Sequence, residues 1–139
     1  MQKFSSAIFG IALLGAGLVL GTWHAQRAHA ASTHVYELRT YHCYPGKLPD
    51  LLTRFRDHTT ALFERHGMTN VGYFIPDKTP DTLTYVLRHD NQEQAMKNWD
   101  EFGKDPEWVK VRTASEANGK IVEKVDRQFM SPTDFSKLQ

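Results

Sequence analysis

Three side chains near the start of the chain have types and spacing that suit ligand binding. Glu37, Arg39 and Tyr41 are two residues apart, so in a β-strand they project from one face. Arg39 and Tyr41 could then donate hydrogen bonds to an anion or a carbonyl oxygen. The alternative, which we favour, is structural: Glu37 and Arg39 form an ion pair that satisfies their charges and fixes the register of the sheet.

His58 is the histidine that best suits acid–base chemistry. It lies beside the apolar stripe of a predicted helix, and the ordinary pKa of histidine suits a general base. From there it could enter a pocket between helix and sheet, together with Tyr73 and Tyr85. The plainer interpretation is a solvated or core histidine with no part in any reaction.

The remaining patterns predict neither a metal site nor a cofactor. His58 and His66 are eight residues apart, which is not the spacing of zinc-protease histidines. A single axial histidine on haem is the alternative that stays open. Since the sequence contains no glycine-rich phosphate loop and no nucleophile elbow, it leaves undecided whether the chain is an enzyme and identifies no catalytic residue.

Cys43 is the only cysteine in the chain. It therefore excludes an intramolecular disulfide and a cysteine-type zinc site. We expect it to be a small residue at the end of a strand. A free thiol, or a disulfide between two chains, is the alternative.

The N-terminal segment has the pattern of a secretory signal peptide. Lys3 precedes an apolar stretch over residues 7–20, and Ala28 and Ala30 provide a cleavage site of small residues. The stretch is shorter than the roughly 20 residues that span a bilayer comfortably; an uncleaved anchor is the alternative. We therefore expect removal of residues 1–30, which leaves residues 31–139 as one domain, periplasmic or secreted, without a stable membrane span.

The charge of this domain excludes one class of partner. The whole chain has 17 basic and 16 acidic residues. Two of the basic residues, Lys3 and Arg27, lie in the predicted signal, so the domain keeps 15 basic and 16 acidic residues. A nearly neutral domain lacks the basic footprint of a nucleic-acid-binding protein.

The spacing of apolar residues indicates four strands and two helices, the second helix in two pieces. This β-α-β-β-α-β order is typical of a ferredoxin-like α+β domain, in which helices cover one face of an antiparallel four-stranded sheet. In the first helix, Arg54 is predicted to be largely solvated. The predicted strands cover residues 34–42, 68–75, 82–89 and 121–130, and the predicted helical segments cover residues 47–66, 90–102 and 105–117.

The uncovered face of this sheet predicts a second copy of the chain. The first strand would place Val35 and Tyr41 on one face and Tyr36 and Leu38 on the other. An exposed sheet face with such large groups is an association surface. A twofold homodimer that packs sheet against sheet would bury it.

Several short segments, in order, resemble the NIPSNAP family. Together they extend over about residues 34–138, nearly the whole predicted domain. The segments are residues 35–41 (VYELRTY), 45–47 (PGK), 66–67 (HG), 71–73 (VGY), 105–108 (DPEW) and 129–135 (FMSPTDF).

The resemblance implies a dimeric α/β-barrel, in which two ferredoxin-like domains join through their sheets, and it implies no settled reaction. Together with the signal-peptide pattern, it favours an exported homodimer that acts as a small-ligand-binding or interaction module. Related dimeric barrels include cofactor-independent monooxygenases, dehydratases and haem-handling proteins. The alternative is therefore a small cofactor-independent enzyme, similar to a monooxygenase, that acts on an apolar or aromatic substrate in a helix–sheet pocket.

Overall fold

The structure is a computed structural model that describes residues 34–138. The predicted signal peptide lies outside the described residues. Within the described part, no helix is long and apolar enough to cross a membrane. The elements are β1 (Val35–Cys43), α1 (Leu48–Arg54), η1 (Phe55–Thr59), α2 (Thr60–Arg65), β2 (Thr69–Phe74), β3 (Thr82–His89), α3 (Gln92–Lys104), α4 (Pro106–Ser115) and β4 (Val122–Met130).

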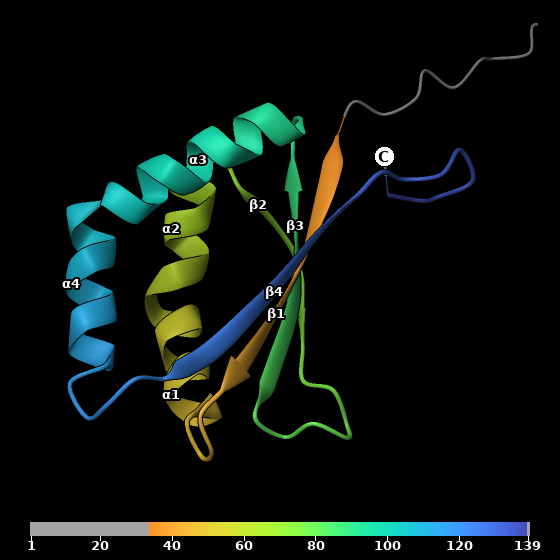
Figure 1. The fold of residues 1–139 in the computed structure, drawn as a ribbon. Coiled ribbons are helices and arrows are strands. Elements are labelled where there is room, and N and C mark those ends of the chain that lie inside the picture. The colour runs from red at the N-terminus through yellow and green to blue at the C-terminus, as the bar shows by residue number, and fades with distance from the viewer. Residues whose placement is uncertain (1–33, 139) are drawn as a thin grey trace, which may run out of the picture.

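The four strands form one antiparallel sheet in the order β2-β3-β1-β4. The helices lie together on one face of this sheet (Figure 1). Order, direction and layering confirm the predicted ferredoxin-like α+β domain. The other face, which we call the open face, carries Tyr36, Leu38, Thr40 and His42 of β1 and their partners on the neighbouring strands.

The first predicted helix is interrupted by a π-helical turn. After α1, the segment η1 adopts the wider winding, and Thr60 N donates to Phe55 O at the end of that turn. The hydroxyl of Thr59 donates to the carbonyl oxygen of Arg54 at 3.1 Å, so a side chain replaces a backbone partner there. Short π turns inside α-helices occur often at functional sites, and this turn begins directly after Arg54.

The second predicted helix is split, as expected. Asn91 begins α3 by accepting a hydrogen bond from Gln94 N, and Asp105 begins α4 by accepting from the backbone of the first turn. Arg65 and His66, at the end of α2, both bond to Asp105 at 2.7 Å. These contacts with His66 and then Arg65 lower the pKa of Asp105. The same carboxylate therefore starts α4 and ties it to α2.

Aromatic rings fill the space between the helices and the sheet. Tyr85 of β3 is fully buried, and its ring centroid lies 5.2 Å from that of Phe55 and 6.0 Å from that of Phe63. Tyr73 stacks on Tyr85 from β2 at 5.3 Å. Such pairs add to the stability that area burial provides. Trp99 and Trp108 pack against this core from α3 and α4, respectively.

Cys43 is the last residue of β1 and is buried, in agreement with its predicted place at a strand end. Burial, followed by the charge of Asp81, raises the pKa of the thiol. A buried thiol with a raised pKa is a poor nucleophile.

Candidate functional site

Glu37 is a buried carboxylate with three donors around it. Its side chain is fully buried and accepts hydrogen bonds from Arg39 Nη1 at 2.8 Å, His89 Nε2 at 2.9 Å and Trp99 Nε1 at 2.6 Å. An ionised carboxylate only accepts hydrogen bonds, so the proton lies on Nε2 of His89. β1, β3 and α3 thus meet at the carboxylate of Glu37. The ion pair between Glu37 and Arg39, which we favoured from the sequence, is present.

The surroundings of Glu37 keep it ionised. Burial by itself raises the pKa of this carboxyl, but the hydrogen bonds from His89, Trp99 and Arg39 outweigh burial and lower it. Glu37 therefore acts as an acceptor that positions Arg39, and not as a proton donor.

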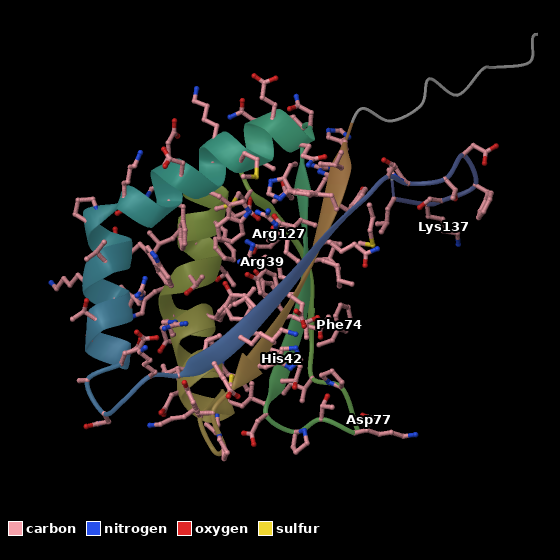
Figure 2. The ribbon with its side chains drawn as sticks, in the orientation of Figure 1. Arg39, His42, Phe74, Asp77, Arg127 and Lys137 are labelled. Atoms are coloured by element: carbon pink, nitrogen blue, oxygen red, sulfur yellow. The ribbon has the colours of Figure 1, made fainter. Side chains whose placement is uncertain are left out.

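Arg39 extends from this network across the aromatic rings. Its guanidinium carbon lies 4.1 Å from the ring centroid of Trp99 and 5.5 Å from that of Tyr41, within the range of cation–π attraction. Arg127 of β4 is its direct partner in the sheet register, and both arginines lie on the side of the sheet that faces α3 (Figure 2). Like charges in such positions repel each other, so this face of β1 and β4 suits an anion.

Two buried donors near Tyr41, Nε of Arg39 and Nε of Arg54, lack an acceptor among the described residues. The ring centroid of Tyr85 lies 5.3 Å from that of Tyr41. Burial, and then Tyr41, raise the pKa of Tyr85 well above its ordinary value, so its hydroxyl keeps its proton. Buried donors rarely remain unpaired in proteins, and an acceptor from outside the chain could reach Arg54, which lines a cavity.

Tyr41 and Arg54 also form part of the wall of a cavity of about 310 Å³. This size is at the lower end of the range for small-ligand sites. The cavity lies where the start of β4 and the end of β1 face α1 and α4. Its lining residues are Tyr41, Arg54, Arg112, Glu116, Lys120, Val122 and Val125.

His58 does not line the cavity beside Tyr41. It is exposed and lines a groove of about 540 Å³ between α1–η1 and α4. The expected pocket that His58 would share with Tyr73 and Tyr85 is not found, because aromatic rings fill that space. Tyr73 instead donates its hydroxyl hydrogen bond to Asn70.

The sequence-based candidates thus separate into two groups. Glu37, Arg39, Tyr41 and Tyr85 come together on the helix-covered face of β1 and β3, whereas His58 lies apart. Tyr73 touches the first group only through its ring. Sequence reasoning missed His89 and Trp99, which donate hydrogen bonds to Glu37. It also missed Arg112 and Lys120, which line the cavity beside Tyr41.

The prediction that Arg54 is largely solvated was wrong. Its residue exposure is 5%, because α4 covers it. Arg54 follows the apolar residue Leu51 by three positions, and residues three apart share a helix face. This spacing was the available signal for its burial.

The described residues contain no group of three or more histidine, cysteine, aspartate or glutamate side chains that could hold a metal ion.

Comparison with known proteins relates this geometry to a family. Residues 36–137 match the sequence model of the NIPSNAP family. No functionally curated protein matches the chain.

Solved structures with the same fold have low sequence identity to this chain. A NIPSNAP family protein of unknown function from Agrobacterium tumefaciens has 22% identity and a TM-score of 0.66, over 76% of this chain and 94% of its own. An uncharacterized NIPSNAP-like domain protein from Burkholderia xenovorans has 17% identity and a TM-score of 0.66, over 76% and 90%. SnoaB, a cofactor-independent oxygenase from Streptomyces nogalater, has 10% identity and a TM-score of 0.54, over 77% and 99%. At these identities the likeness shows the fold alone.

Proposed function

The chain belongs to the NIPSNAP family, and from this membership we propose that it is an exported homodimer in which each subunit binds one small ligand. The ligand site is the cavity beside Tyr41, and the dimer forms through the open face of the sheet. The signal-like pattern of residues 1–30 supports export.

Ligand binding is supported chiefly by the unpaired donor of Arg54. Its Nε is buried and has no acceptor among the described residues, and Arg54 lines the cavity together with Tyr41. A ligand with an acceptor atom there would remove the cost of this unpaired group, which is about 1–3 kcal/mol.

The open face supports the dimer. Leu38 and Val86 are partners at its centre and are only partly buried. Phe74 of β2 is 59% exposed and lies on the side of the sheet away from the helices (Figure 2). A Cβ atom at Gly72 would lie 2.9 Å from the Phe74 ring, so glycine leaves room for that ring to lie along β2. A second copy would cover these groups.

The two parts of the proposal are compatible. The ligand cavity faces the helices, whereas the dimer surface is the opposite face of the same sheet. Ligand binding and association therefore use different residues and can be tested separately.

A binding role fits the cavity better than the alternative of a cofactor-independent enzyme. SnoaB shares the fold, but a shared fold does not carry chemistry. None of the residues that line this cavity is a histidine, and its one carboxylate, Glu116, lies near Arg54 and Arg112. A general base would need a free lone pair within reach of the substrate.

A fragment screen followed by ¹⁵N-detected NMR tests ligand binding. We expect small apolar and aromatic fragments to shift the amide signals of Tyr41, Val122 and Val125. Val125→Trp fills the cavity and should abolish these shifts, whereas Val109→Trp places the same ring at an exposed site on α4 and should preserve them. Shifts that persist in Val125→Trp, or that map to other parts of the domain, would contradict the proposal.

A further inference from the structure

The charges around the cavity indicate which class of ligand it binds. Arg54, Arg112 and Lys120 contribute three cations to its wall, and Glu116 contributes the one anion. We propose that the ligand is a small carboxylate whose anionic group binds at Arg54 and whose apolar body lies against Tyr41, Val122 and Val125. This inference rests on the proposed function of the same cavity.

Arg54 is a buried cation whose positive charge is only weakly balanced by the nearest carboxylate. Only 4% of its side chain is exposed, and its nearest carboxylate oxygen, Oε1 of Glu116, is 3.5 Å from Nη1. Its closer partner is neutral, the hydroxyl of Ser115 at 3.1 Å. Good charge-assisted hydrogen bonds are about 2.7–2.9 Å long, so Glu116 neutralises this guanidinium poorly.

Arg39 provides an internal comparison. Its guanidinium lies 2.8 Å from Glu37, a distance at which an arginine is properly paired. Around Arg54, burial lowers the pKa, and the charge of Glu116 offsets this only in part. Nε is unpaired in both arginines, but only Arg54 lacks a close carboxylate, so it is the one whose charge needs a further acceptor.

Glu116 is also shared. Its second oxygen, Oε2, lies 3.6 Å from Nε of Arg112, so a single carboxylate serves two guanidinium groups. Lys120 completes the positive wall, and no ion pair to it is found among the described residues. An incoming anion would meet a local excess of positive charge, which favours both its approach and its binding.

The other side of the cavity is apolar. Tyr41, Val122 and Val125 form it, and the ring of Tyr41 is held edge-on by Phe55 at 5.8 Å. An inorganic anion would leave these groups without contacts. A carboxylate on a small ring or aliphatic body would use both sides of a cavity of about 310 Å³.

Isothermal titration with matched probes tests the assignment. The pairs are benzoate with benzamide and cyclohexanecarboxylate with its amide, which have similar shapes and differ in charge; inorganic phosphate is the purely ionic probe. We expect each carboxylate to bind about tenfold more tightly than its amide, and the preference to fall as sodium chloride is raised. Phosphate should bind more weakly than either carboxylate.

Variants then locate the anion. Arg54→Gln should bring the carboxylate and the amide to equal affinity. Because Arg54 is buried, Lys120→Gln and Arg112→Gln provide the same test at exposed positions, with an expected two- to fivefold loss for carboxylates only. Arg56→Gln is the control, since Arg56 is an exposed cation of the same helical segment that does not line the cavity.

The outcomes separate this inference from the function on which it rests. Equal affinity of wild type for carboxylates and amides would overturn the anionic ligand and leave small-ligand binding intact. A charge preference that survives in all three cavity variants would also overturn it, as would phosphate binding more tightly than benzoate. If neither these probes nor the apolar fragments bind in the cavity, the proposed function itself fails.

Discussion

Replacing Glu37 with alanine should lower the free energy of unfolding by about 3–5 kcal/mol, because removal of one partner leaves a buried charge uncompensated. Arg39 would keep its guanidinium over Trp99 without a carboxylate. His89 Nε2 and Trp99 Nε1 would also lose their acceptor. Urea unfolding followed by circular dichroism measures the loss.

Two further variants show whether the loss arises from the buried charge. Asp126→Ala removes an exposed carboxylate that contacts His42 and Lys124, and exposed pairs contribute little, so its stability should stay close to wild type. Glu37→Leu combined with Arg39→Met removes both charges and should recover a large part of the loss. If Glu37→Ala were as stable as Asp126→Ala, the network around Glu37 would not hold the fold together.

The pH dependence of this contribution has a definite sign. The pKa of Glu37 is lowered in the folded state, since its hydrogen bonds outweigh the effect of burial. Its contribution is therefore fully present above the unfolded-state pKa, about 4.3, and is lost as pH falls through the lower folded-state value. We expect the difference in stability between wild type and Glu37→Ala to be constant near neutral pH and to shrink below about pH 4.

The strands were largely predictable from the sequence because alternation is a local signal. The predicted third strand, residues 82–89, agrees with β3 at both ends, and the other three strands agree within one residue. The π turn at η1 was not predictable, because it changes backbone hydrogen bonding over Phe55–Thr59 without removing the apolar stripe. Side-chain periodicity does not record which carbonyl oxygen an amide contacts.

The candidate site was predictable only where it lies within one strand. That Glu37 and Arg39 share a face follows from their spacing, and the structure places them 2.8 Å apart. His89 and Trp99 join them from 52 and 62 residues away from Glu37, and no local pattern connects such positions. Arg54 is buried because α4 packs over α1, and this also depends on tertiary contacts.

Leu38 lies at the centre of the open face, through which we propose that the dimer forms. Leu38→Glu should raise the dimer dissociation constant by roughly 100-fold or more, because it places an unpaired carboxylate at the centre of a face that we propose to be buried. Leu38 lies between Val86 and Gln128 in the sheet, so no cation is its direct partner there. Sedimentation velocity over a range of concentrations measures the change.

A control variant and a binding measurement show whether Leu38→Glu acts on the dimer interface alone. Val109→Glu adds the same charge at an exposed valine on α4, on the helix side of the domain, and should leave the dimer intact. Because the cavity beside Tyr41 opens on that side too, a monomeric Leu38→Glu variant should still bind benzoate. Wild-type protein that is monomeric at micromolar concentration, or a Leu38→Glu variant that remains dimeric, would show that the open face is not the interface.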